Sequence, residues 1–251
     1  MEYAALTFWL LVIVFSAMGV HQLWSSLVQP KIVNSVLLPG TLVAQLGHVL
    51  GLLITGGTVN NTTLVKDDES GEPETGSDTQ TRIPVIGPIF IALLPLAGCA
   101  VAIYWVAMYF QSPILAAMTD GADVRGIGLP TSFGLLFAMM RQTVTLVEQL
   151  FLVVWNADLH NWRTLLFLYL VICLVVRMAP FTGNLKGSLG AIFVFGLLAF
   201  LFGQVTSETP GAIESAWPLI NFCVAVSLFL LILSLIVKGA VSLGRTLFVE
   251  K

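Results

Sequence analysis

The most informative shortage in this 251-residue sequence is charge. Charged residues make up 10% of the chain, against about 25% in an average soluble domain. Histidine is scarce, with 3 residues, and the net charge of −3 leaves no basic excess. A nucleic-acid-binding protein needs a basic face, so that class is excluded. Hydrophobic residues make up 57% and the mean hydropathy is +0.93, which also excludes a soluble globular enzyme and a disordered chain.

Cysteine is almost as sparse as histidine. Cys99, Cys173 and Cys223 each lie inside an apolar run, and no Cys-x-x-Cys spacing occurs. An odd number of isolated cysteines provides neither a disulfide framework nor a metal-ligand pattern. We expect all three to pack as small apolar side chains.

Long apolar runs dominate what is present. A spanning helix needs about 20 mostly apolar residues. We therefore predict an all-α class: a polytopic membrane helical bundle, with 1–251 as a single transmembrane domain of about seven transmembrane helices, or six if the polar fourth run lies tilted or inserts only in part. The first run is expected to be an uncleaved span, because no basic residue precedes it. The runs are roughly 4–26, 34–55, 84–110, 131–155, 163–179, 188–206 and 213–240.

Prolines interrupt two of these runs. Pro39-Gly40 lies early in the second run, so its regular part is expected to begin there. The third run contains Pro84, Pro88 and Pro95 and is expected to be kinked or broken. The segment 60–82 is rich in Ser, Thr, Gly and acidic residues. It cannot bury a core, so we expect an acidic, mobile extramembrane loop.

The distribution of Lys and Arg sets the predicted orientation. With seven spans and the N-terminus outside, most basic residues fall on the inner side, and the acidic residues of the 60–82 loop fall outside. We therefore predict an integral protein of the bacterial inner (plasma) membrane, with the N-terminus outside and the C-terminus inside. The inner basic residues are Lys31, Arg125, Arg177, Lys186, Lys238, Arg245 and Lys251.

The second run carries the most informative motif. Pro39-Gly40 leads into Ala44-Gln45-Leu46-Gly47-His48, and the run closes at Thr55-Gly56-Gly57. This pattern resembles the second helix of the intramembrane zinc metallopeptidases of the site-2 protease type, in which a Pro-Gly pair precedes His-Glu-x-x-His. In that motif two His on one helix face bind zinc, and the Glu polarises the metal-bound water.

Two further stretches carry the same resemblance. Residues 177–187, with Asn184 before Leu185-Lys186-Gly187, are similar to the segment that holds the family's third zinc ligand, an Asp. Residues 87–98 are similar to the family's proline-containing third helix. The matched stretches together cover well under half of the chain.

Three of the four residues that the family's chemistry requires are replaced. Ala44 takes the place of the first His, Gln45 of the Glu and Asn184 of the Asp, while His48 remains. Ala cannot bind a metal, Gln cannot accept the proton, and an amide brings no charge. The resemblance therefore implies a pseudo-metallopeptidase that is not an enzyme and holds neither metal nor cofactor. The alternative is an ordinary helix with one buried His.

A second polar set lies in the fourth run: Arg141, Gln142, Glu148 and Gln149. Arg141 and Glu148 are two helical turns apart and share a face. Charges within a bilayer are costly and usually face protein or water. Three interpretations stay open: a face buried against another helix of this chain or of a partner subunit, an ion or proton path, and a tilted interfacial helix whose charges reach the headgroups.

These observations predict a non-catalytic membrane scaffold or accessory subunit. Its partners would be the lipid bilayer and other membrane protein subunits, with no nucleic acid. One alternative is a small transporter or channel component that uses Arg141 and Glu148. The other is a divergent but active intramembrane protease.

Overall fold

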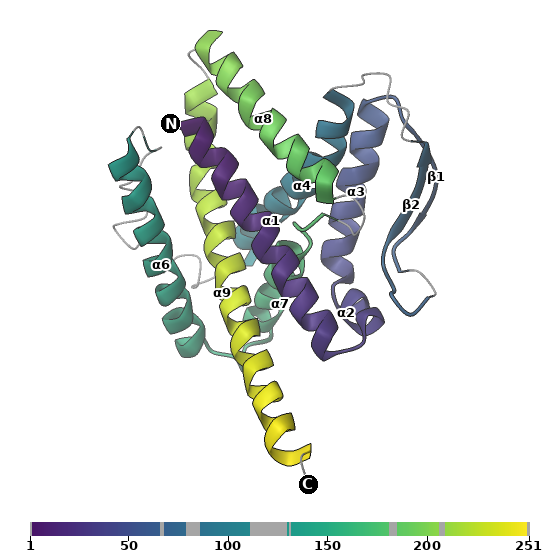
Figure 1. The fold of residues 1–251 in the computed structure, drawn as a ribbon, viewed down its shortest axis with the longest axis vertical. Coiled ribbons are helices and arrows are strands. Elements are labelled where there is room, and N and C mark those ends of the chain that lie inside the picture. The colour runs from purple at the N-terminus through teal and green to yellow at the C-terminus, as the bar shows by residue number, and fades with distance from the viewer. Residues whose placement is uncertain are drawn as a thin grey trace.

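The structure is a computed structural model, and it describes residues 2–65, 68–78, 86–110, 130, 132–180, 185–205 and 209–249. The described part is a helical bundle with one small hairpin (Figure 1). The predicted all-α class is therefore confirmed, apart from that hairpin. The elements are α1 (Glu2–Leu27), α2 (Pro30–Val36), α3 (Leu38–Ile54), β1 (Thr58–Thr63), β2 (Glu74–Asp78), α4 (Ile86–Phe110), α6 (Phe133–Asn156), α7 (Trp162–Val176), α8 (Leu185–Val205) and α9 (Thr209–Val249).

Four of the described helices are long and apolar enough to cross a membrane: α1, α4, α6 and α9. The pair α2–α3 qualifies as a fifth span if its two parts are taken together. The apolar parts of α7 and α8, Trp162–Val176 and Ser188–Leu201, are shorter. The described residues thus support a membrane protein with four or five candidate spans, and the predicted count of seven is not confirmed.

A bend of 78° separates α2 from α3 at Leu37. Pro39 lies in the first turn of α3, where its missing N–H and fixed φ are tolerated. Gly40 follows because a Cβ there would collide with the backbone carbonyl of Cys173 on α7. The expected start of the regular part at Pro39-Gly40 is confirmed to within two residues. By contrast, α4 continues through Pro95 as one helix, so of the two expected outcomes, a kink or a break, the break does not occur there.

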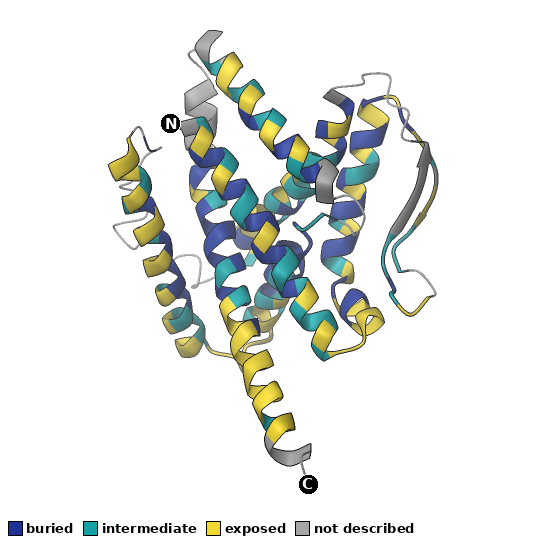
Figure 2. Cartoon of the chain, viewed as in Figure 1, coloured by how far each residue is buried: buried dark blue, intermediate teal, exposed yellow. Residues whose placement is uncertain are grey.

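Side-chain contacts fix the directions of the helices. Trp9 contacts Trp217 and donates to Asn221 Oδ1 at 2.8 Å, while Trp24 donates to Ser234 Oγ at 2.8 Å, so α1 and α9 run parallel. Their buried faces form much of the core (Figure 2). The two chain termini lie at opposite ends of the molecule (Figure 1).

The direction of α7 breaks the predicted alternation of spans, whereas the direction of α8 agrees with it. Tyr3 packs against Phe200 at 5.9 Å, so α8 runs antiparallel to α1. Phe167 packs against Phe110 at 6.2 Å near the end of α4, so α7 runs antiparallel to α4. α7 therefore starts at the end of the bundle that carries α2 and ends just before Arg177, which is still in contact with α2, whereas α8 runs away from that end (Figure 1). The turn 157–161 consequently lies at the same end of the bundle as α2 (Figure 1), although the alternating scheme places this turn outside and the segment of Lys31 inside.

The predicted loop 60–82 contains regular structure. Strands β1 and β2 pair antiparallel, with Thr58 opposite Asp78 and Thr63 opposite Glu74. The β-branched residues of β1 favour this extended conformation. The hairpin leaves the far end of α3 through Gly56, whose φ of 78° favours glycine, and its tip returns to α2 (Figure 1). The acidic tip therefore lies beside Lys31, which differs from the expected separation of the loop from the inner lysine; residues 79–82 lie outside the described residues.

Candidate functional site

The motif residues of α3 face the interior of the bundle. Ala44 is 0% exposed and Gln45 is 3% exposed, while His48 is half-buried. Gly47 and Gly51, on the same helix, lie against the backbone of α4, where a Cβ would come within 2.7 Å of Leu94 O and 2.8 Å of Ile91 Cα. The face that carries the zinc site in the enzymes that this motif resembles is here a close helix–helix contact.

His48 has a hydrogen-bond partner on the neighbouring helix. Its side chain donates to the backbone carbonyl of Ile91 on α4. Residue 95 would normally donate its N–H to that carbonyl, but it is Pro95 and has no N–H. His48 thus interacts with a carbonyl that the proline leaves without its helical partner. The surviving imidazole has a structural task that needs no metal.

Asn184, the predicted remnant of the third ligand, lies outside the described residues. Among the residues that are described, no group of three or more His, Cys, Asp or Glu side chains is close enough to hold a metal ion.

A polar cluster lies where α1, α2, α7 and the hairpin tip meet. Arg177 Nη2 donates to Asn34 Oδ1 at 2.6 Å, and the same oxygen is 3.0 Å from His21 Nε2. Asn34 Nδ2 donates to the carbonyl of Ser70 at 2.7 Å. The Glu72 carboxylate interacts electrostatically with Arg177. These side chains connect four elements through a buried amide, since Asn34 is 1% exposed.

The charge in this cluster is strongly buried. Arg177 is 6% exposed, and its Nε donates no hydrogen bond within the described residues. It follows α7 and lies outside the helices that qualify as spans. Burial lowers the pKa of Arg177 to about 10, and the nearby carboxylate of Glu72 opposes this shift. The guanidinium stays charged at neutral pH, so the hairpin tip supplies negative charge where the bundle buries a positive one.

The sequence alone does not predict that these residues form a cluster. Arg177 and Asn34 are 143 residues apart, and Arg177 was assigned to an inner loop. One signal was available: an Asn at the start of an apolar run and a His near the end of another are the kind of polar groups that seek partners inside a bundle.

The four predicted polar residues of α6 are found at the edge of the molecule. α6 packs mainly against α9, with Phe151 contacting Phe229 at 4.5 Å (Figure 1). Arg141 and Glu148 are exposed on the opposite face, whereas Gln142 and Gln149 are half-buried at its border. In the part of the chain that the structure describes, neither charged side chain has a hydrogen bond or an ion pair.

The outward face of α6 is otherwise apolar. Its exposed apolar side chains surround Arg141 and Glu148 at helical spacing, and Thr145 lies between the two charges. Phe137, Val144, Leu152 and Trp155 are 60% or more exposed. The shared face that the spacing predicts is confirmed, and the structure adds that it points away from the bundle.

Comparison of the chain with protein-family models, with curated proteins and with solved structures finds no match.

Proposed function

We propose that this chain is a non-catalytic integral membrane subunit that binds a partner protein through the outward face of α6. The observation that carries this proposal is the placement of two charges in the middle of an outward-facing spanning helix. Arg141 is eight residues from Phe133, and Glu148 is eight residues from Asn156. At the helical rise, each charge is about 12 Å from the nearer helix end.

The cost of exposing these charges to lipid favours a partner. Translocon scales assign about 2.5–3.5 kcal/mol to a charged residue at the centre of a span. A partner helix that places an acid opposite Arg141 and a base opposite Glu148 would offset that cost. A parallel pairing of two α6 helices around a two-fold axis would place like charges together, so charge complementarity favours a different protein over a second copy.

The state of the α3 motif supports a role without catalysis. Gln45 cannot act as a base, and His48 is occupied by the carbonyl of Ile91. We infer that the chain is a pseudo-metallopeptidase related to the site-2 protease type, whose helices are retained for binding. The same proposal includes the bacterial inner membrane, with the N-terminus outside and the C-terminus inside. Reporter fusions at both ends test it: an external N-terminus with an internal C-terminus is expected, and both ends on one side would contradict it.

Photo-crosslinking in native membranes tests the partner directly. A photoreactive residue at Val144 is expected to give a protein adduct of defined mass. The matched control is the same residue at Phe193 on α8, which is also exposed, at 59% against 60%. Arg141→Glu is expected to abolish the Val144 adduct while the chain still inserts. Lipid adducts alone at Val144 would contradict the proposal.

Metal analysis tests the absence of catalysis. The purified chain is expected to hold no stoichiometric zinc and to cleave no peptide. Stoichiometric zinc that disappears in His48→Ala would overturn this part of the proposal and would favour the divergent protease.

A transport role makes a different demand on α6. It needs a water-filled path beside Glu148, whereas the apolar cavity found among the described residues lies between α1, α2 and α9. Cysteines at positions 141, 145 and 148 are expected to resist water-soluble thiol reagents. Rapid labelling at all three positions would favour the transporter.

A further inference from the structure

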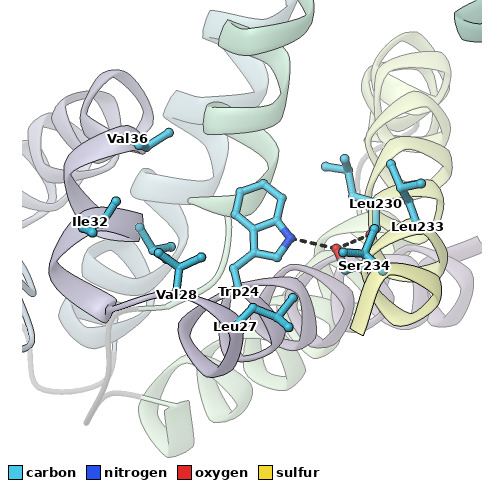
Figure 3. Close-up of a pocket in the computed structure, with 10 residues that line it drawn as sticks. Trp24, Leu27, Val28, Ile32, Val36, Leu230, Leu233 and Ser234 are labelled. Atoms are coloured by element: carbon cyan, nitrogen blue, oxygen red, sulfur yellow. Dashed lines mark hydrogen bonds between the residues drawn. The ribbon is translucent and has the colours of Figure 1, made fainter. Parts of the chain in front are cut away.

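An apolar groove lies between the end of α1, the helix α2 and the second half of α9 (Figure 3). Its volume is about 360 Å³, in the range of about 300–1,000 Å³ that small ligands occupy. Trp24 and Leu27 come from α1, Val28 from the bend after it, Ile32 and Val36 from α2, and Leu233 and Val237 from α9. Several of these side chains are half exposed, so the groove is open on one side.

The groove offers no free hydrogen-bonding group. Its polar side-chain groups belong to Trp24 and Ser234, which are already paired: Trp24 Nε1 donates to Ser234 Oγ at 2.8 Å (Figure 3), and Ser234 Oγ donates to the Leu230 carbonyl at 2.6 Å. A polar ligand would therefore lose its hydrogen bonds to water and gain none. An unbranched hydrocarbon chain meets no such cost.

The position of the groove along the membrane follows from the hairpin tip. The polar backbone at Ser70–Gly71 lies against α2 at Lys31 and Asn34, and such backbone cannot be exposed to hydrocarbon. One side of α2 therefore lies at the water boundary, while Ile32 and Val36 face the groove. Trp24 is the amphipathic residue expected at this level. The groove thus opens to lipid just inside the headgroup region.

A cation lies at the same level on α9. Lys238 follows Val237 directly, lies one helical turn after Ser234 and is exposed. A headgroup above the groove would be within reach of its flexible side chain, and a phosphate of net negative charge complements it.

We propose that this groove holds one acyl chain of an anionic phospholipid whose headgroup interacts with Lys238. The lipid seals the contact between α1, α2 and α9. The site is independent of α6, so it stands or falls separately from the partner proposed there.

Native mass spectrometry of the full chain in detergent tests the site, with phosphatidylglycerol and phosphatidylcholine of identical acyl chains as probes. Phosphatidylglycerol is expected to bind about fivefold more tightly, because one Lys near a membrane surface contributes about 1 kcal/mol. Lys238→Gln is expected to reduce it to the level of phosphatidylcholine. Arg245→Gln, a change to another cation of α9 outside the groove, is expected to have no effect.

A bulky residue tests the acyl-chain part. Val237→Trp fills the groove and is expected to abolish retention of both lipids, whereas Leu235→Trp on the opposite side of the helix is expected to leave it unchanged. If Val237→Trp does not purify, Leu233→Trp, which lines the same groove, takes its place. Equal binding of the two lipids, or retention after the groove is filled, would overturn the proposal.

Discussion

Two arginines of this chain show opposite ways of accommodating charge in an apolar protein. Arg177 is 6% exposed, donates to Asn34 and lies near Glu72. Arg141 is exposed on α6 with no ion pair or hydrogen bond from its side chain in the described ranges. The first charge is satisfied within the chain, by a hairpin that spans the length of α3. The Arg141 charge has no partner among the described residues, so its energetic cost depends on what surrounds α6.

The largest change in stability is expected from a substitution of Arg177, the buried arginine. Arg177→Leu removes a cation near Glu72 and a donor from Asn34, and breaking a buried charge interaction costs up to about 3–5 kcal/mol. Thermal unfolding of the purified chain in detergent is expected to show a clear drop in Tm. Arg141→Leu is the control and is expected to change Tm little.

A double variant separates the charge interaction from packing. Arg177→Leu combined with Glu72→Gln is expected to recover part of the loss, because no unpaired carboxylate remains. If Arg177→Leu unfolds at the same temperature as the parent, the contacts of Arg177 within the chain do not stabilise the fold.

A smaller loss of stability is expected when α3 is pushed away from α7 beside Arg177. Gly40→Ala places a Cβ against the Cys173 carbonyl and close to Arg177 Cγ, so α3 and α7 must separate. Overpacking of this kind costs about 1–3 kcal/mol. Gly98→Ala is the matched control, because its Cβ would lie 3.7 Å from Val43 O, at ordinary contact distance. Equal Tm values for the two variants would show that the close contact at Gly40 is not needed.

A still smaller effect is expected when the attachment of the hairpin tip to α2 is weakened. Asn34→Ala removes the bond to Ser70 and leaves Arg177 with one partner fewer. A Glu-specific protease is expected to cut the tip at Glu69 and Glu72 several-fold faster than in the parent. Ser35→Ala is the control, since that hydroxyl donates only to the Lys31 carbonyl within α2. Unchanged cleavage in Asn34→Ala would mean that other contacts hold the tip.

The smallest effect concerns His48, another polar group satisfied within the chain. His48→Leu is expected to cost about 1 kcal/mol, the net contribution of one hydrogen bond. In a Pro95→Ala background the helix supplies its own N–H to Ile91, so the same substitution should cost almost nothing. The coupling between the two positions is the measured quantity. Equal costs in both backgrounds would show that His48 does not compensate for the proline.

The sequence predicts the helices of this fold well and their three-dimensional relations poorly. Hydropathy places a described helix on each of the seven runs, and Pro39-Gly40 predicts the start of α3. The spacing of Arg141 and Glu148 predicts their shared face. Which way that face points is not encoded in the spacing, because it depends on where α9 lies.

The polar contacts between distant segments were the least predictable feature. The acidic stretch 60–82 reads as a solvated loop because it has too few apolar side chains to form a core. Its partial order comes instead from strand pairing and from Asn34 on α2. Likewise, the pairing of His48 with the carbonyl freed by Pro95 needs α3 and α4 side by side. A resemblance to a metal-binding motif drew attention to the right histidine and suggested a different task for it.

The length of α9 has a mechanical consequence. Its 41 residues extend about 60 Å, roughly twice the thickness of a bilayer's hydrocarbon core. Beyond Lys238 the helix projects past the bundle as a single rod (Figure 1), and a Cβ at Gly239 or Gly244 would meet nothing within 4 Å. With no lateral support there, its stiffness depends on its own backbone hydrogen bonds, and these two glycines are the points at which it bends most easily.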